Sequence, residues 1–126
     1  MRCVIVVGSN SGQREETIGR SLRFLEDNGS IRKKSAIYET LDCLGKGPGY
    51  LNCVLELETA IEEDILLRRI KEFEAMCGRT AQKKEKGEVE IDIDIVVWER
   101  EVRRSEDFKA HYFREGFHQI AGIENI

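Results

Sequence analysis

The sequence predicts an α+β fold, a ferredoxin-like β-α-β-β-α-β sandwich with an antiparallel four-stranded sheet and both helices on one face. Two observations support this prediction most strongly. A β-branched run at residues 2–8 and a strictly alternating segment at residues 89–98 begin and end the series of elements. Between them, apolar residues recur with a helical period at residues 13–26 and 62–77. Because no repeat or linker divides the chain, residues 1–126 are expected to form a single domain.

The first strand and the first helix follow directly from residue type. The run at residues 2–8 is rich in Val and Ile and leads into the turn-rich residues 8–12, which predicts a strand followed by a loop. The apolar stripe of the helix at residues 13–26 consists of Ile18, Leu22 and Leu25. Gly29 is suited to a left-handed cap at its end.

The middle of the chain predicts two strands and a second helix. Residues 30–40 are a polar-leaning strand, and residues 41–49, with three glycines and the only proline, are a loop. Residues 50–59 alternate, and one face of that strand carries Leu51, Cys53, Leu55 and Leu57. Residues 61–78 form the clearest helix, because acidic residues fill its first turn and Gly78 ends it.

The last predicted strand is preceded by a basic loop and followed by a weak pattern. Residues 79–87 are polar and include Lys83, Lys84 and Lys86. In residues 89–98, one face carries Val89, Ile91, Ile93, Ile95 and Val97, and the other carries Glu90, Asp92, Asp94, Val96 and Trp98. After Arg100 we expect an aromatic tail with no clear period.

Composition and cysteine use restrict the class of protein. The 126 residues are 40% hydrophobic and 35% charged, with a net charge of −4, which argues against a protein that binds nucleic acid through a basic field. The apolar run near the N-terminus is too short for a signal peptide or a membrane span, so we expect a cytoplasmic chain. The four cysteines are far apart and are expected to be free thiols, with Cys3, Cys53 and Cys77 buried.

Asp92 and Asp94 are the most informative pair in the sequence. They lie on one face of a strand, about 6.6 Å apart, although Asp is a poor strand former. One or two Mg²⁺ ions would neutralise both carboxylates, and phosphate oxygens would complete the metal shell. The alternative is an outer sheet face on which acids only keep the strand soluble. The basic loop at residues 79–86 favours phosphate handling.

Three other features are weaker when taken alone. Residues 8–10 could place backbone N–H groups near an anion, although the spacing of a phosphate-binding loop is absent. Residues 50–52, Tyr-Leu-Asn, could present a ring and an amide to a flat heterocycle, or could simply begin a strand. The pair at residues 111–112 could contact a nucleotide or form part of a packed tail.

Taken together, the motifs point to one family. They lie at residues 7–10, 35–40, 50–59, 74–79, 91–95, 111–112 and 116–117. In this order and spacing the chain resembles the 6-hydroxymethyl-7,8-dihydropterin pyrophosphokinases of the folate pathway. The resemblance implies transfer of a pyrophosphoryl group from ATP to the hydroxymethyl group of a reduced pterin, which releases AMP. It also implies two Mg²⁺ ions held between Asp92, Asp94 and the phosphates of ATP.

The resemblance also implies roles for individual residues. Asp92, Asp94 and Arg79 match the family's catalytic positions. The implied pterin-binding residues are Thr40, Leu41, Leu44, Tyr50, Asn52 and Phe117. The implied ATP-binding residues are Glu74, Arg79, Lys83, Lys84, Lys86, Ile95, His111, Tyr112 and Arg114. ATP and a reduced pterin are therefore the expected partners, without nucleic acid or membrane, for a monomer or weak homodimer.

The sequence departs from the family pattern in the loop before Asp92. The Trp-Gly-Pro-Arg segment of the family falls on residues 86–89, so the tryptophan, the proline and the arginine are absent. Three hypotheses follow. The chain is an active pyrophosphokinase in which a lysine replaces the arginine, although lysine offers a point charge and not a planar fork. Alternatively, it is a weak or inactive homologue that binds nucleotide, metal or a pterin-like ligand. The third alternative is an interaction module with an acidic sheet face.

Overall fold

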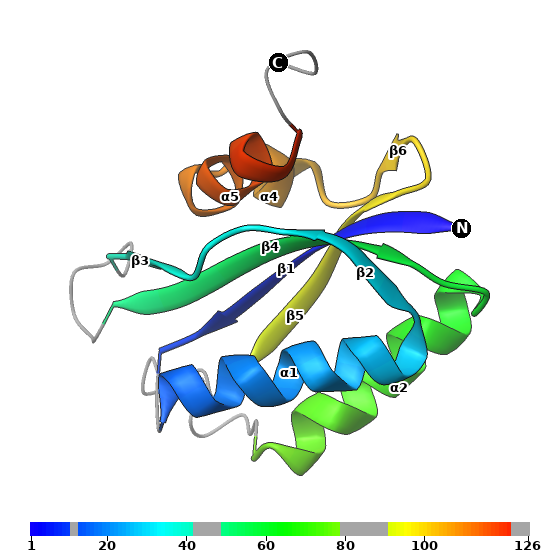
Figure 1. Ribbon diagram of the computed structural model, residues 1–126, viewed down its shortest axis with the longest axis horizontal. Helices are drawn as coiled ribbons and strands as arrows, with labels where there is room; N and C mark the ends of the chain where they lie inside the picture. Colours follow the sequence, from blue (N-terminus) through cyan, green and yellow to red (C-terminus); the bar gives the residue numbers. More distant parts are fainter. Residues whose placement is uncertain (11–12, 42–48, 79–90, 122–126) are drawn as a thin grey trace.

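The computed structural model describes residues 1–10, 13–41, 49–78 and 91–121, and its elements follow the predicted order (Figure 1). The strands are β1 (Arg2–Ser9), β2 (Ser30–Lys34), β3 (Tyr38–Thr40), β4 (Tyr50–Glu58), β5 (Asp92–Trp98) and β6 (Glu101–Val102). The helices are α1 (Arg14–Asn28), α2 (Glu63–Met76), α4 (Ser105–Lys109) and α5 (His111–Ala121). The predicted α+β class is confirmed.

The sheet is antiparallel, with the strand order β2-β4-β1-β5-β6, and β3 also pairs with β4. In the described part of the chain it has 6 strands, where the sequence predicted four. One reason is that the expected strand at residues 30–40 is split at Ser35. The hydroxyl of Ser35 accepts the Val54 N–H at 3.0 Å, so a side chain replaces a backbone acceptor there and the strand is interrupted. The other addition is the short strand β6, which pairs with the end of β5.

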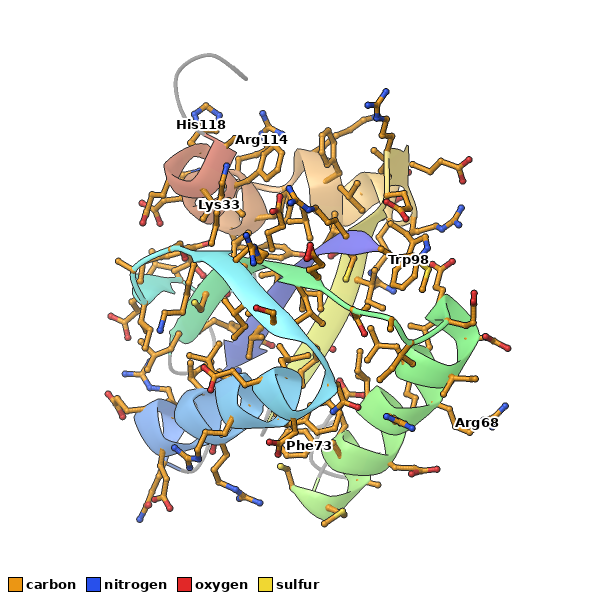
Figure 2. The ribbon with its side chains drawn as sticks, turned by 45° about the vertical axis from the view of Figure 1, so that its right-hand side comes forward. Lys33, Arg68, Phe73, Trp98, Arg114 and His118 are labelled. Atoms are coloured by element: carbon orange, nitrogen blue, oxygen red, sulfur yellow. The ribbon has the colours of Figure 1, made fainter. Side chains whose placement is uncertain are left out.

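The main core lies between the sheet and the helices α1 and α2, which cover the same face, as predicted (Figure 1). We call it the first core cluster, and its buried members are Cys3, Ile5, Val7, Ile18, Leu25, Leu51, Cys53, Leu55, Leu57, Leu66, Ile70, Ile91, Ile93, Ile95 and Trp98. Phe24 and Phe73 stack between the two helices, with ring centroids 4.4 Å apart. Figure 2 shows Phe73 between α1 and α2, while Arg68 points away from the sheet.

The prediction of a patternless tail after Arg100 was wrong, because residues 105–109 and 111–121 form α4 and α5. These helices lie on the face of the sheet opposite α1 and α2 (Figure 1), so the expectation of helices on one face alone was incomplete. The second core cluster consists of Val6, Val54, Val96, Phe113 and Ile120. Phe113 and Ile120 are seven positions apart, which places both on the buried side of α5.

The predicted alternation of the last strand holds for residues 91–95 and then changes. Ile5 pairs with Ile95 and Val4 pairs with Val97, so Val96 is an extra residue in the ladder. Val97 packs against the second core cluster, and Trp98 belongs to the first. The sequence-based assignment of these two faces was therefore wrong beyond the bulge, while Asp92 and Asp94 lie on the face opposite α1 and α2, as expected.

Two glycines at helix ends can be compared with the predictions from the sequence. Gly29 has φ 174°, which is extended backbone, so the predicted left-handed cap was wrong; a Cβ there would lie 2.5 Å from the Glu58 carbonyl oxygen. Gly78, at the end of α2, is left-handed, with φ 88°.

Cys3 and Cys53 are buried free thiols, Cys77 is half-buried, and Cys43 lies outside the described residues. Within the described ranges, no helix is long and apolar enough to span a membrane.

Candidate active site

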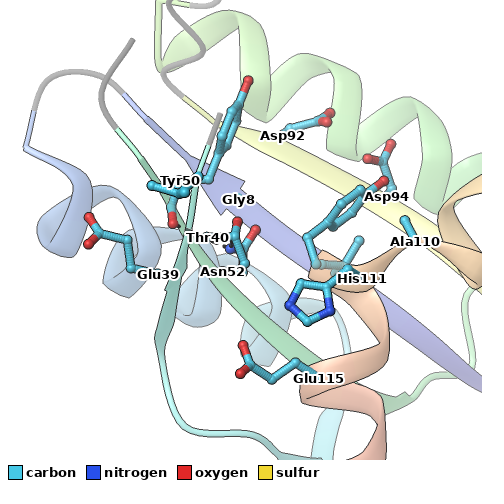
Figure 3. Close-up of a pocket in the computed structure, with 13 residues that line it drawn as sticks. Gly8, Glu39, Thr40, Tyr50, Asn52, Asp92, Asp94, Ala110, His111 and Glu115 are labelled. Carbon is cyan, nitrogen blue, oxygen red and sulfur yellow. Dashed lines mark hydrogen bonds between the residues drawn. The ribbon is translucent and has the colours of Figure 1, made fainter. Parts of the chain in front are cut away.

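A cavity of about 760 Å³ lies between the sheet and the start of α5 (Figure 3). Its described lining comes from four strands, one helix and two residues beside them. The lining residues are Val6, Gly8, Glu39, Thr40, Leu41, Tyr50, Asn52, Asp92, Asp94, Ala110, His111, Tyr112 and Glu115. The cavity is on the same face as the second core cluster, so the first core cluster lies beneath its floor.

The floor of the cavity is a row of residues across three strands. Gly8 on β1 pairs with Asn52 on β4 and with Asp92 on β5. Neighbouring strands are about 4.8 Å apart, so Asn52 and Asp92 lie on either side of a residue that has no side chain. A Cβ at Gly8 would lie 3.4 Å from the Asn52 Oδ1 atom. The row therefore forms a trough with an amide on one bank and a carboxylate on the other.

The amide of Asn52 is held in a fixed orientation. Its Nδ2 donates to the Thr40 hydroxyl at 2.8 Å and lies 3.3 Å from the Tyr50 carbonyl oxygen. Because Asn52 is only 3% exposed, these contacts determine the positions of the amide nitrogen and the amide oxygen. The Oδ1 acceptor faces the side of Gly8, and the Thr40 hydroxyl, which accepts from Asn52, keeps its own proton to donate.

Asp92 and Asp94 form an adjacent acidic pair on the other bank of the trough. Burial raises the pKa of Asp94 to about 8, and the negative charge of Asp92 contributes to the increase. An increase of this kind means that the described surroundings do not fully compensate two adjacent carboxylates. Their hard oxygen atoms fit Mg²⁺, which typically takes one or two protein carboxylates. Within the described part of the chain no third His, Cys, Asp or Glu joins them, so water or phosphate would supply the remaining ligands.

A network of three side chains lies beside this pair. The Arg104 Nε atom is 3.7 Å from the Asp94 Oδ1 atom and also donates to the carboxylate of Asp107. The hydroxyl of Tyr112, a cavity residue, donates to the other oxygen of Asp107. Arg104 lowers the pKa of Asp94, although burial and Asp92 outweigh this effect.

The helix α5 is seated on the sheet through Tyr38 and Gly116. The Tyr38 hydroxyl donates to the Tyr112 carbonyl oxygen and accepts the Gly116 N–H at 3.2 Å. Burial raises the pKa of Tyr38, so this hydroxyl stays protonated. A Cβ at Gly116 would lie 2.6 Å from the Val54 Cγ2 atom, closer than real contacts allow. This close approach brings the first turn of α5, with His111, to the cavity (Figure 3).

Arg14 closes the opposite rim. From the first turn of α1, its Nη1 donates to the Glu39 carboxylate at 2.7 Å and to the Gly49 carbonyl oxygen at 2.6 Å. Thr40 follows Glu39 and Tyr50 follows Gly49, and these two residues pair with each other between β3 and β4. We call this arrangement the Arg14 neck, and it fixes both walls of the cavity at the point where the chain leaves and re-enters the sheet.

Eight of the residues predicted for the site lie together in this cavity. They are Thr40, Leu41, Tyr50, Asn52, Asp92, Asp94, His111 and Tyr112. Five others lie outside the described residues, namely Leu44, Arg79, Lys83, Lys84 and Lys86. The described lining does not include the remaining four, which are Glu74, Ile95, Arg114 and Phe117.

These four residues have other contacts. Ile95 is a member of the first core cluster, and the buried carboxylate of Glu74 accepts the Ile93 N–H at 2.9 Å. Phe117 stacks on Phe113, with ring centroids 5.1 Å apart, and the Arg114 guanidinium lies over the Phe117 ring. Their contacts lie outside the described lining of the cavity, and their ligand roles stay predictions.

Sequence reasoning missed three acidic or basic residues of the site. Glu39 lies next to Thr40, and its place in the cavity lining depends on the Arg14 neck. Glu115 is four positions after His111, so a predicted helix at residues 111–121 would have found it. No sequence signal marks Arg104, because its proximity to Asp94 depends on the turn between β5 and β6.

Comparison with known proteins places this geometry in a family. The family model of 7,8-dihydro-6-hydroxymethylpterin-pyrophosphokinase (HPPK) matches residues 4–121. A 2-amino-4-hydroxy-6-hydroxymethyldihydropteridine pyrophosphokinase from Aquifex aeolicus is 37% identical over 111 residues, which cover 86% of this chain and 69% of that protein.

Two bifunctional proteins show the same likeness over part of their length. A folate synthesis bifunctional protein from Arabidopsis thaliana is 31% identical over 97 residues, or 75% of this chain and 20% of that protein. One from Chlamydia muridarum is 37% identical over 100 residues, or 73% of this chain and 22% of that protein. With the family model spanning almost all of the described fold, the chain belongs to the 7,8-dihydro-6-hydroxymethylpterin-pyrophosphokinase family.

Proposed function

We propose that the protein transfers a pyrophosphoryl group from ATP to the hydroxymethyl group of 6-hydroxymethyl-7,8-dihydropterin in folate biosynthesis. The hydroxymethyl oxygen forms a bond to the β-phosphorus, the bond from that phosphorus to the α–β bridging oxygen breaks, and AMP leaves. Membership of the family supports this reaction. The observation that carries it is the cross-strand row, in which Gly8 separates Asn52 from Asp92 by the width of two strand spacings.

The pterin would lie on the amide bank of the trough. Tyr50 offers a ring face, and Asn52 and Thr40 offer an acceptor and a hydroxyl donor in fixed positions. A flat heterocycle with ring nitrogens and an exocyclic amino group suits such a set. Because Gly8 has no side chain, the heterocycle can approach the strand backbone closely.

The phosphates of ATP would lie on the carboxylate bank. Asp92 and Asp94 would hold Mg²⁺, which neutralises phosphate charge and aligns the reacting groups when it is bound. His111 and Tyr112, at the start of α5, would contact the nucleotide. Among the described residues, four carboxylates line the cavity, Glu39, Asp92, Asp94 and Glu115, so an anionic nucleotide requires an accompanying cation. We place this activity in a cytoplasmic monomer or weak homodimer that binds neither nucleic acid nor membrane.

The test is an AMP-release assay with ATP, Mg²⁺ and the reduced hydroxymethylpterin. We expect Asp92→Asn and Asp94→Asn each to lower the rate by about 10³-fold or more, as expected for lost metal and phosphate contacts in phosphoryl transfer. Asp64→Asn, which changes an exposed acid of α2 on the opposite face, should leave the rate unchanged. If both site variants retain the wild-type rate and the wild-type affinity for Mg·ATP, the proposed site is wrong.

A second candidate is a homologue that binds the same ligands but turns over slowly. It is favoured by the sequence of residues 86–89, which lacks the tryptophan, proline and arginine of the family pattern. The two candidates share the binding site and differ only in the rate of AMP release. If calorimetric titration detects binding of Mg·ATP while AMP release is very slow, the slowly reacting homologue is the correct candidate.

A further inference from the structure

Arg104 lies beside the acidic pair of the cavity, and half of its side chain is exposed to solvent. It sits between β6 and α4, and the bulged residue Val96 positions this connection by accepting the Arg103 N–H at 2.8 Å. The Nε atom of Arg104 is 3.7 Å from Asp94 Oδ1. The Arg104 side chain is 51% exposed, whereas that of Asp94 is 14% exposed, so a solvent-exposed cation faces a largely covered carboxyl group.

The second contact of Arg104 gives it an anchor at the rim of the cavity. Its Nε also donates to Asp107, and Asp107 accepts the Tyr112 hydroxyl. Tyr112 lines the cavity, so the guanidinium is tied to the wall on which the nucleotide is proposed to lie. Both contacts run through Nε, and the planar fork of a guanidinium suits two oxygen atoms of a phosphate.

A divalent cation and Arg104 compete for the same oxygen atoms. A metal ion bound to Asp94 would lie within a few ångströms of the guanidinium, and the two positive charges repel each other. At the same moment the metal-bound nucleotide would bring negatively charged phosphates to this side of the cavity. Arg104 therefore exchanges one anionic partner for another: its side chain leaves the carboxyl group of Asp94 and contacts the phosphate chain, without a change in the backbone.

We propose that Arg104 is a mobile counter-charge of the nucleotide site: it pairs with the Asp94 carboxyl group while the metal is absent, and it binds the phosphate chain once a divalent cation occupies that group. This inference rests on the proposed function, since it takes Asp94 as a metal ligand. It assigns a planar cationic donor to a chain whose residues 86–89 lack the arginine of the family pattern.

The test compares binding of the metal alone with binding of the nucleotide. In Arg104→Gln, Mn²⁺ alone should bind roughly three- to tenfold more tightly, because a competing charge is gone. The same variant should bind Mn²⁺ with α,β-methylene-ATP about tenfold or more weakly, because a charge-assisted phosphate contact is lost. Titration calorimetry, and the electron paramagnetic resonance of free Mn²⁺, measure both affinities without turnover.

The matched control is Arg103→Gln, which removes a neighbouring arginine that pairs with Glu63 and Glu101. It should change neither affinity. Arg104→Lys keeps the charge without the fork, so it should bind Mn²⁺ like the wild type and the nucleotide less tightly. This variant also serves if Arg104→Gln does not fold.

Opposite shifts in the two affinities support the inference. Equal shifts in one direction, or no shift, overturn it. Asp94→Asn separates this outcome from failure of the proposed function. If Asp94→Asn abolishes metal-dependent nucleotide binding while Arg104→Gln changes nothing, only the counter-charge is wrong. If Asp94→Asn binds metal and nucleotide like the wild type, the proposed metal site fails and the counter-charge fails with it.

Discussion

At the scale of single residues, Asp94 is held in an environment that does not suit its ionised form. Its side chain is 14% exposed, Asp92 lies on the same face of the strand, and the one described cation beside it is also bound to Asp107. A carboxylate placed in this way stores electrostatic cost in the ligand-free protein. A bound cation would relieve that cost, so the same feature that weakens the free fold favours a loaded site.

This cost predicts a pH dependence. The pKa of Asp94 is raised to about 8 by burial and by Asp92, whereas an unfolded Asp has a pKa of about 3.9. Folding therefore favours the protonated acid, and this contribution to stability is complete below pH 4 and is lost as the pH rises through 8. The free energy of unfolding of Asp94→Asn should exceed that of the wild type by about 1–3 kcal/mol at pH 8 and should differ little from it at pH 4.

Chemical denaturation in the presence of a chelator, at a series of pH values, measures this difference. A gap between Asp94→Asn and the wild type that is constant from pH 4 to pH 8 would contradict the raised pKa. Adding Mg²⁺ at pH 8 should narrow the gap, because only the wild type retains the carboxylate that the metal binds.

At the scale of elements, α5 depends on one glycine. The backbone of α5 approaches β4 so closely that a Cβ at Gly116 would lie 2.6 Å from Val54 and 2.7 Å from the Tyr38 hydroxyl. Gly116→Ala should therefore destabilise the protein by about 1–3 kcal/mol, although alanine is the better helix former. Because His111, Tyr112 and Glu115 move with α5, nucleotide affinity should fall as well.

Gly19→Ala is the matched control for this helix variant. Gly19 lies within α1, where the nearest described side chain to a Cβ would be that of Arg23, at 3.6 Å. This substitution should stabilise the protein by about 0.5–1 kcal/mol. Urea denaturation measures both variants, and a Gly116→Ala protein as stable as the wild type would show that α5 can move away from the sheet without cost.

The same helix shows where sequence reasoning stops. The helices α1 and α2 are 15 and 14 residues long and have continuous apolar stripes, so their period alone predicted them. The helix α5 has 11 residues with a glycine at its centre, which is unfavourable for an isolated helix. The reason for that glycine is contact with Val54, which is far away in the sequence. Local preference therefore opposed the structure there.

The candidate site divides in a similar way. Asp92 and Asp94 could be found from the sequence because strand alternation places them on one face, opposite isoleucines of the core. Alternation could not predict the bulge at Val96, which returns Trp98 to the first core cluster. Arg104 could not be found either, since its contact with Asp94 requires this bulge and the turn that follows.

At the scale of the whole molecule, charge balance decides how fast the reaction can be. The net charge is −4, and part of this negative charge lines the cavity, so cations from the chain must help to offset the phosphates in the transition state. Val89→Arg restores an arginine at the position where the family pattern has one. If the natural protein is slow for lack of it, AMP release should rise, since one such donor is worth roughly 10³-fold or more.

Replacing Lys83, Lys84 and Lys86 together by Gln tests the opposite explanation. If these lysines supply the charge, AMP release by the triple variant should fall from a substantial rate, and Val89→Arg should add little. Steady-state AMP release and Mg·ATP affinity are measured for both variants. An unchanged rate in both would mean that neither position takes part in the reaction.

The Arg14 neck has a consequence for how members of this family can diverge. One side chain of α1 joins Glu39 to Gly49, so the two ends of the intervening stretch are held together by residues outside it. Loop-closure entropy grows slowly, by only about 0.6 kcal/mol for each doubling of length. The length and the sequence of residues 41–48 can therefore vary during evolution, while Thr40 and Tyr50 keep their pairing between β3 and β4. Acceptor choice can change in this way at little cost to the scaffold.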